Sequence, residues 1–139
     1  MSIHGIGAYY DDDVSSSFIT ESCACIGYGK SEASSLYEML RRIKIGDIIY
    51  IKSYQPTTHT VFIKAIGFVT GKNVKEYNFP GSNESMGYGR KVSWKRIYTT
   101  KDEWIRIQLP QEDMKNNVYN NTLYEEYSFS IIEKLLDQF

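Results

Sequence analysis

The 139-residue sequence is poor in cysteine, histidine and proline, with two, two and three of them respectively. Cys23 and Cys25 are too few for a disulfide framework, and cysteines two residues apart in a strand are not natural bridging partners. No stretch approaches the roughly 18 apolar residues that a membrane span requires, and the N-terminus lacks a signal-peptide pattern. These absences predict a cytoplasmic protein without a membrane partner.

The motifs of the common enzyme classes are also absent. The sequence has no Walker A loop, no Rossmann glycine fingerprint and no G-x-S-x-G nucleophile elbow. His4 and His59 could join the two cysteines around zinc, but their spacing follows no zinc pattern. No thiol is paired with a histidine in a way that indicates nucleophilic catalysis. We therefore expect no metal, no cofactor and no catalytic residue.

Charge of both signs is present in nearly equal amounts, and the formal net charge is −1. This balance argues against tight, sequence-independent binding to duplex nucleic acid. Residues 71–108 carry eight Lys/Arg against four Asp/Glu, whereas residues 109–139 carry two against six. The distribution predicts a modest basic face beside an acidic one, although ordinary solvated surface would give the same counts.

Hydrophobic patterning predicts the α+β class, and the length fits one domain covering residues 1–139. Apolar runs at residues 44–54 and 60–71 predict an antiparallel hairpin of central strands, which Lys52 and Lys64 interrupt. Ser31 is the expected N-cap of an early helix, and a second helix closes the chain. We expect a curved sheet or small barrel of about six mostly antiparallel strands. Further strands are expected at residues 4–10, 18–26, 91–99 and 103–109, loops at residues 11–17 and 72–91, and helical stripes at Ala33, Leu36, Tyr37, Leu40 and Ile43 and at Ile131, Ile132, Leu135, Leu136 and Phe139.

The order of these segments resembles the PUA-like superfamily over residues 18–135. The matching features are Gly46 and Asp47 before an apolar strand, Gly67 near the end of the next strand, and the V-x-W strand at residues 92–94. More narrowly, the chain is similar to EVE and ASCH domains and to the modified-base-reading N-terminal domains of McrB-type restriction proteins. It departs from many EVE domains because residues 23–28 stand where those domains carry a tryptophan. The resemblance implies a barrel-like domain whose pocket reads a nucleobase, without catalysis.

The tetrapeptide GYGK at residues 27–30 returns as GYGR at residues 87–90. Glycine lets a backbone approach a ligand closely and leaves N–H groups for its oxygens, while a tyrosine ring offers a stacking face. The cation that follows each copy could meet a phosphate. We predict that the two loops flank one pocket, although two turns with an exposed tyrosine would give the same sequence. The predicted ligand contacts in these loops are Gly27, Tyr28, Gly29, Lys30, Tyr88 and Arg90.

Two further sets of residues are candidates for the same pocket. Trp94 and Arg96 point the same way in a regular strand, so that an indole and a guanidinium could sandwich a base. The segment YYDDD at residues 9–13 predicts Tyr10 and Asp12 as contacts, with a carboxylate that accepts hydrogen bonds from a base edge. A core tryptophan, a solvated acidic loop and a divalent-cation site are the alternatives for these residues.

Together these observations predict a non-catalytic domain that accepts a nucleobase in an aromatic pocket. The base belongs either to a modified DNA or RNA strand or to a free nucleotide or cyclic nucleotide that the protein sequesters. By analogy with related domains, the setting would be phage–bacteria conflict. The alternative is an interaction protein that inhibits a partner enzyme through an acidic C-terminal surface containing Glu125, Glu126 and Glu133. The sequence leaves the oligomeric state open.

Overall fold

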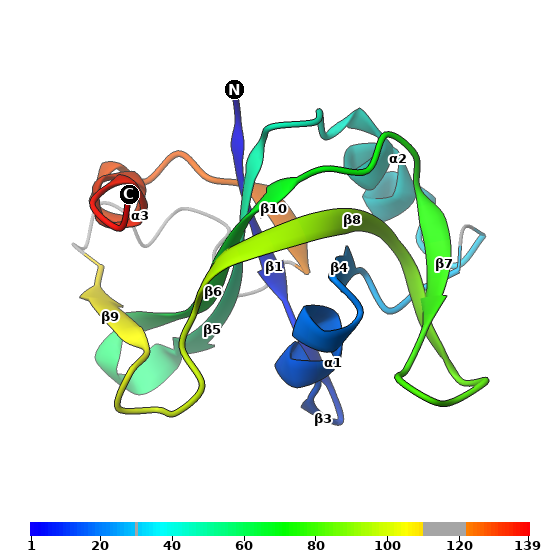
Figure 1. Cartoon of the computed structure of the whole chain (residues 1–139). Coiled ribbons are helices and arrows are strands. Elements are labelled where there is room, and N and C mark those ends of the chain that lie inside the picture. The colour runs from blue at the N-terminus through cyan, green and yellow to red at the C-terminus, as the bar shows by residue number, and fades with distance from the viewer. Residues whose placement is uncertain (30, 110–121) are drawn as a thin grey trace.

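The computed structural model describes residues 1–29, 31–109 and 122–139, and its centre is one strongly curled sheet. The strand order is β10-β1-β5-β6-β8-β4, with β7 paired to β8 and β9 paired to β6. The β1–β5 pair is parallel, and the other pairs of this sheet are antiparallel in the described residues. Figure 1 shows β8 arching across the molecule, so that the sheet forms a half-barrel. The strands of this sheet are β1 (Ile3–Gly7), β4 (Cys23–Cys25), β5 (Ile48–Gln55), β6 (Thr60–Val69), β7 (Lys75–Asn78), β8 (Ser85–Ile97), β9 (Ile105–Gln108) and β10 (Leu123–Glu125).

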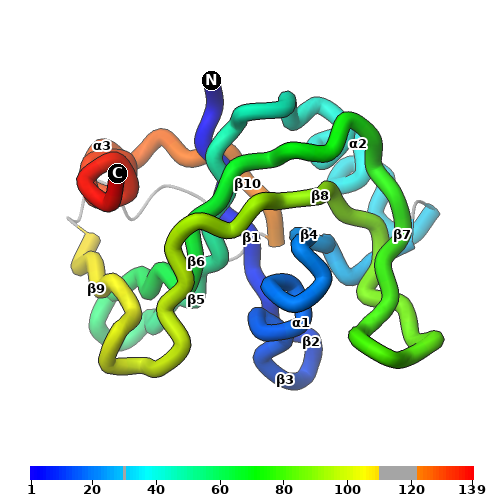
Figure 2. The backbone as a smooth tube through the Cα atoms, in the orientation of Figure 1, coloured from blue at the N-terminus to red at the C-terminus, as the bar shows by residue number. Residues whose placement is uncertain are grey.

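In the part of the chain that the structure describes, three α-helices and a small hairpin surround the sheet. The helices are α1 (Ser15–Thr20), α2 (Ser34–Arg42) and α3 (Phe129–Leu136), the 3-10 turn η1 (Pro56–Thr58) joins β5 to β6, and strands β2 (Tyr9–Tyr10) and β3 (Asp12–Asp13) form a separate two-stranded sheet. Figure 2 shows α1 beneath the arch, α2 near one end of it, and α3 beside β9 at the other end. The predicted α+β class with a curved sheet is therefore confirmed. None of the helices in the described ranges is both long and apolar enough to cross a membrane.

Apolar side chains cover both faces of the sheet and form two core clusters. In β5, Ile49 belongs to the cluster that also contains Phe18 of α1 and Leu40 of α2. Its neighbour Tyr50 belongs to the cluster that contains Ile131 of α3. Successive side chains of a strand point to opposite faces, so a strand covered on both faces reads as a continuous apolar run. This confirms the interpretation of the run that precedes η1, and the predicted hairpin of β5 and β6 is confirmed as well.

A β-bulge at Lys64 in β6 interrupts the alternation of side chains between the two faces of the sheet. Ile51 of β5 pairs with Ala65, but the next residue, Lys52, pairs with Ile63, which leaves Lys64 as the extra residue. Ile63 packs in the α3 cluster and Ala65 in the α1 and α2 cluster, so the alternation shifts by one residue between them. A bulge redirects side chains in this way, and bulges occur often beside binding sites.

Four element predictions were wrong. The loop expected at residues 11–17 contains β3 and the start of α1. The strand expected at residues 18–26 is shorter, because Phe18 belongs to α1 and only Cys23–Cys25 form β4. The loop expected at residues 72–91 contains β7 and the start of β8, whose glycines and polar residues hide the strand periodicity. The early helix begins at Ser34 rather than behind Ser31, and Ala33 occupies its N-cap without a side-chain hydrogen bond.

Candidate functional site

The two Gly-Tyr-Gly loops meet each other through their backbones. The amide of Tyr88 donates to the carbonyl oxygen of Tyr28 at 3.2 Å, and the amide of Ile26 donates to the carbonyl oxygen of Tyr88 at 2.9 Å. Gly27 and Gly87 have φ angles of +78° and +90°, which side-chain-bearing residues rarely adopt. A Cβ on Gly87 would lie 2.6 Å from the backbone nitrogen of Tyr28. The repeated glycines therefore let two chain segments cross closely.

The tyrosine rings of this crossing have different environments. Tyr28 is 43% exposed, whereas Tyr88 is half-buried and packs edge-to-face on Tyr37 with ring centroids 5.2 Å apart. The amide of Gly29 already donates to Glu32 Oε1 at 2.9 Å. The amides of Gly29 and Tyr88 and the ring of Tyr88 are thus already used within the protein, whereas the ring of Tyr28 is exposed.

Arg90 is part of the core framework, so the prediction that it meets a phosphate was wrong. Its side chain is 1% exposed. The guanidinium donates to the carbonyl oxygens of Leu40, at 2.9 Å, and Ile43, at 2.5 Å, where α2 ends, and to that of Gly71 at 2.6 and 3.1 Å. The Arg90 side chain thus ties the C-terminal end of α2, where carbonyl groups need additional donors, to the backbone that follows β6. Lys30, the cation of the first loop, lies outside the described residues.

Trp94 and Arg96 do not form a sandwich. The indole Nε1 of Trp94 donates to the carbonyl oxygen of Phe18 at 3.2 Å, and its ring packs on the cluster that includes α1 and α2. The guanidinium of Arg96 instead lies over the ring of Phe139, 4.7 Å from its centroid. A second bulge, which leaves Lys95 without a partner in the β6–β8 register, separates the two side chains.

Tyr10 links β4 to β8 through its hydroxyl group, whereas Asp12 lies on the surface. The hydroxyl of Tyr10 donates to the carbonyl oxygens of Cys25, at 3.0 Å, and Met86, at 3.2 Å. Burial raises the pKa of this phenol far above its ordinary value. Its pairing partner in the small hairpin, Asp12, is exposed. Tyr10 therefore has a structural role.

The residues considered above as possible metal ligands do not form a metal-binding cluster within the described ranges. Cys23 and Cys25 are free and buried, with their sulfur atoms 3.7 Å apart. Within the described ranges, no three His, Cys, Asp or Glu side chains come together in a way that could hold a metal ion.

A different group of residues, missed by the sequence interpretation, lines three adjoining hollows around Lys64. The first, of about 290 Å³, lies where β1 and β5 end, and it shares Lys64 with a second of about 120 Å³. The second shares Trp104 with a third of about 340 Å³ over the β6–β9 pair. We refer to the three hollows together as the Lys64 groove; the residues that carry its chemistry are Tyr9, Asp13, Ser15, Lys52, Phe62, Lys64, Lys101, Trp104 and Arg106.

The ammonium of Lys64 is the centre of this groove. Lys64 is 8% exposed, and its Nζ lies 2.8 Å from Oδ2 of Asp13 and 4.6 Å from the centroid of the Trp104 ring. Oδ1 of Asp13 accepts hydrogen bonds from the amide of Ser15, at 2.9 Å, and from its hydroxyl, at 2.5 Å. Burial opposes ionisation of Asp13, but the hydrogen bonds from Lys64 and Ser15 outweigh it and hold the pKa below its usual value. The Asp13 carboxylate is therefore charged at neutral pH.

Lys52 is the second buried lysine of the groove. It is 8% exposed, and its Nζ lies 5.5 Å from the centroid of the Tyr124 ring. Burial lowers the pKa of Lys52 to about 8, against the attraction of Glu126. A lysine with this pKa changes charge close to physiological pH, so its contribution to binding an anion depends on pH.

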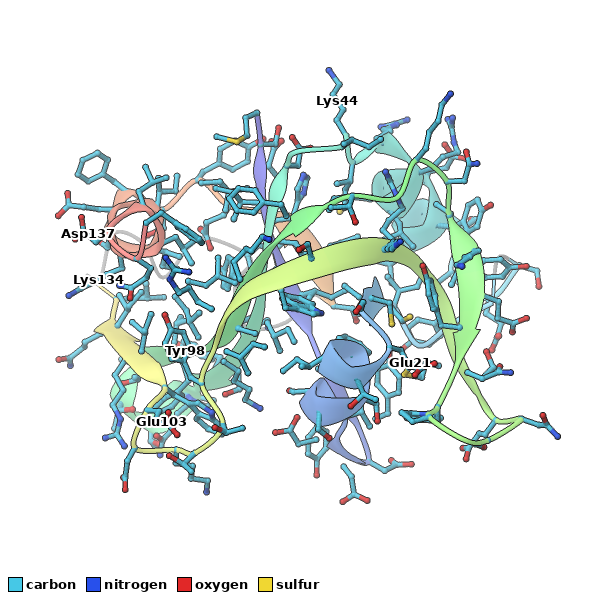
Figure 3. The ribbon with its side chains drawn as sticks, in the orientation of Figure 1. Glu21, Lys44, Tyr98, Glu103, Lys134 and Asp137 are labelled. Atoms are coloured by element: carbon cyan, nitrogen blue, oxygen red, sulfur yellow. The ribbon has the colours of Figure 1, made fainter. Side chains whose placement is uncertain are left out.

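Aromatic rings and further cations form the outer wall of the groove. The rings of Phe62 and Trp104 meet edge-to-face with centroids 6.0 Å apart, and the Arg106 guanidinium lies 5.6 Å from the Phe62 centroid. The Nε1 of Trp104 donates to the carbonyl oxygen of Tyr98 at 3.0 Å; Figure 3 labels Tyr98 on the part of the molecule that carries β9. Tyr9 is 74% exposed. The groove combines ring faces with cations, which suits a flat ligand that carries negative charge.

One of the three acids expected on the C-terminal surface is buried. Glu126 is 4% exposed, and its carboxylate accepts hydrogen bonds from the amide of Ser128 at 2.9 Å and from the hydroxyl of Tyr50. Glu125 is half-buried, and Glu133 is exposed. The prediction that all three acids form one exposed surface was therefore wrong.

Comparison with known proteins identifies a family model but no curated relative. A search of curated proteins found no match. A family model described as a domain of unknown function, DUF8426, matches residues 1–126, which include both the crossing of the two loops and the Lys64 groove. The chain therefore belongs to the DUF8426 family.

Proposed function

We propose that this protein is a non-catalytic binding domain that accepts a nucleobase-containing ligand in the Lys64 groove. The observation that carries the proposal is a nearly buried ammonium beside an aromatic ring, with Lys64 Nζ 4.6 Å from the Trp104 centroid. Bases stack on aromatic faces whatever their identity, and lysine ammonium groups attract phosphate. The groove therefore offers partners for both halves of a nucleotide.

The arrangement of the hollows suggests how such a ligand would lie. The exposed ring of Tyr9 borders the same hollow as Lys52 and Lys64. On the opposite side, Lys101 and Arg106 are exposed beside Trp104. A base stacked on Tyr9 or Trp104 would leave its phosphate within reach of Lys64, which borders the hollows of both rings.

Two kinds of ligand fit this proposal, as the sequence already suggested. The PUA-like resemblance, which we propose as the origin of the curled sheet, favours a base within a strand. The net charge of −1 favours a free nucleotide or cyclic nucleotide. A salt titration separates them, because strand binding releases several counterions and weakens steeply as salt rises, whereas binding of one nucleotide weakens less.

The test compares the Lys64 groove with the loop crossing. The probes are the four ribonucleoside monophosphates and randomised single-stranded DNA and RNA hexanucleotides, titrated against the whole chain. Lys64→Met should weaken binding of the preferred probe by about tenfold or more, because a desolvated charge contact is lost. Lys72→Met, which removes an exposed lysine outside the groove, is the matched control.

The opposite result is equally clear. If Tyr28→Ala and Tyr88→Ala together abolish binding while Lys64→Met binds normally, the ligand lies at the crossing and the groove proposal fails. If no probe binds the wild-type chain at millimolar concentration, the nucleobase proposal itself fails.

The second candidate function is binding to a partner protein. Tyr127 and Phe129 are 73% and 74% exposed at the start of α3, and the acid Glu133 lies on the same helix. Exposed aromatic side chains of this size are typical of protein interfaces. Under this alternative, a Tyr127→Ser, Phe129→Ser double variant loses a co-purifying protein, whereas Lys64→Met retains it.

A further inference from the structure

We propose that Asp13 is a built-in competitor for the anionic part of the ligand: its carboxylate occupies the place at Lys64 that a ligand phosphate takes on binding. The inference rests on the proposed function, because it concerns the same groove. It identifies Asp13 as a residue that sets which anions the groove accepts.

The first argument is the set of donors that surround the Asp13 carboxylate. One oxygen lies 2.8 Å from Lys64 Nζ, and the other accepts the amide and the hydroxyl of Ser15. An ammonium, a hydroxyl and a backbone amide are the donors that bind phosphate oxygens, at the same distances. A phosphate that enters the groove would thus form with Lys64 the contact that Asp13 now makes.

The second argument is the unequal burial of the two partners. The side chain of Lys64 is 10% exposed and that of Asp13 is 42% exposed. Lys64 is held within the ten-residue strand β6, whereas Asp13 ends the two-residue strand β3 of a separate hairpin. When a ligand competes, Asp13 is the partner that can turn into water and regain hydration, and Lys64 stays in place.

The third argument is the polar lining beside the ion pair. The hydroxyl-bearing residues Ser16 and Thr99 border the same 120 Å³ hollow as Asp13 and Lys64. Hydroxyl groups donate hydrogen bonds to phosphate oxygens as well as accepting them. After displacement of Asp13, the Ser16 side chain would complete the surroundings of a bound phosphate, and so would Thr99 once its hydroxyl leaves Glu103, to which it now donates at 3.3 Å.

This arrangement has a consequence for specificity. A simple anion gains contacts with Lys64, but Asp13 loses its own contact with Lys64 at the same time. Because the loss offsets the gain, a simple anion binds weakly. A nucleotide also gains stacking of its base on the aromatic wall. Asp13 therefore restricts the groove to anions that carry a flat ring.

The test measures inorganic phosphate binding to Asp13→Asn and to Asp12→Asn. Both variants remove one formal negative charge, but Asp12 is exposed and forms no ion pair with Lys64 among the described contacts. Asp13→Asn should bind phosphate about tenfold more tightly than the wild type, and Asp12→Asn within about twofold of it. The readout is the indole N–H signal of Trp104 in an NMR titration, because this ring lies against Lys64.

Equal or weaker phosphate binding by Asp13→Asn would overturn the inference. Should that variant fail to fold, Asp13→Ser decides: it also removes the carboxylate that competes for Lys64, so phosphate binding should strengthen, and an unchanged affinity would overturn the inference. Wild-type titration with adenosine and AMP tests the proposed function separately. Tighter phosphate binding by Asp13→Asn without any nucleoside binding would retain the competitor role and reject the nucleobase.

Discussion

The loop crossing and the Lys64 groove use similar residue types for different purposes. Both combine tyrosine or tryptophan rings with cations. At the crossing, the cation Arg90 is fully enclosed by backbone carbonyl groups, and the glycines serve close approach of two chain segments. In the groove, Lys64 pairs with the partly exposed carboxylate of Asp13 and borders open hollows. What separates a structural cation from a binding cation is therefore the partner that satisfies it.

If this comparison is right, Arg90→Met gives the largest effect on stability. It leaves the carbonyl groups at the end of α2 without their donor, so the free energy of unfolding should fall by about 3–5 kcal/mol. Arg96→Met, on the exposed part of the same strand, should lower it by less than about 1 kcal/mol. Urea denaturation of both variants measures the difference. Equal losses would show that Arg90 does not hold the framework together.

Gly87→Ala should give the next largest effect. The new Cβ would meet the backbone of Tyr28 and force a φ angle of +90°, so we expect a loss of about 2–3 kcal/mol. Gly81→Ala is the matched control, because Gly81 has a φ angle of +66° but no atom within 4 Å of a new Cβ. Its free energy of unfolding should fall by only about 1 kcal/mol. Thermal unfolding of the pair separates the cost of the crossing from that of the backbone angle.

The lowered pKa of Lys52 predicts that anion binding and stability change in opposite directions with pH. Its pKa is about 8 in the folded chain against the ordinary 10.5, so the unfolded chain binds more protons between those values. The free energy of unfolding should therefore rise with pH across that window, whereas binding of AMP should weaken by about tenfold as Lys52 loses its charge. Both trends should disappear in Lys52→Met, measured by denaturation and by titration from pH 7 to 10.5. A trend that persists in this variant must come from another group.

Tyr28→Ala should give the smallest effect. Because the crossing is held by backbone hydrogen bonds and the ring is 43% exposed, we expect a change in stability below about 0.5 kcal/mol and unchanged nucleotide binding. A large loss of binding would return the site to the Gly-Tyr-Gly loops and end the contrast between the two regions.

Local signals in the sequence were reliable where one element decides its own conformation. The turn at Gly46 and Asp47 is an example: Gly46 has a φ angle of +93°, and the carboxylate of Asp47 accepts the amide of Lys44. The continuous apolar runs predicted the central hairpin, and the closing stripe predicted α3. Lys52 and Lys64 interrupt the runs of the hairpin, but nothing in those runs indicates that the two lysines border a binding groove.

The candidate site depended on information that no local window contains. Asp13 and Lys64 are 51 positions apart, and the two Gly-Tyr-Gly copies cross because β4 and β8 pair in one particular register. The bulge at Lys64 likewise depends on how β6 pairs with β5. A shift of one residue in pairing turns a side chain to the other face of a sheet, so direction is set by tertiary structure.

The sequence by itself therefore determined the α+β class, the central hairpin and the residue types available for binding. These follow from periodicity, turn chemistry and composition, which act over a few residues. Only the tertiary structure decided that Arg90 is enclosed and that Lys64 faces a groove with Asp13 and Trp104. The reason is that burial and ion pairing depend on the neighbours that folding brings together, and those neighbours are distant along the chain.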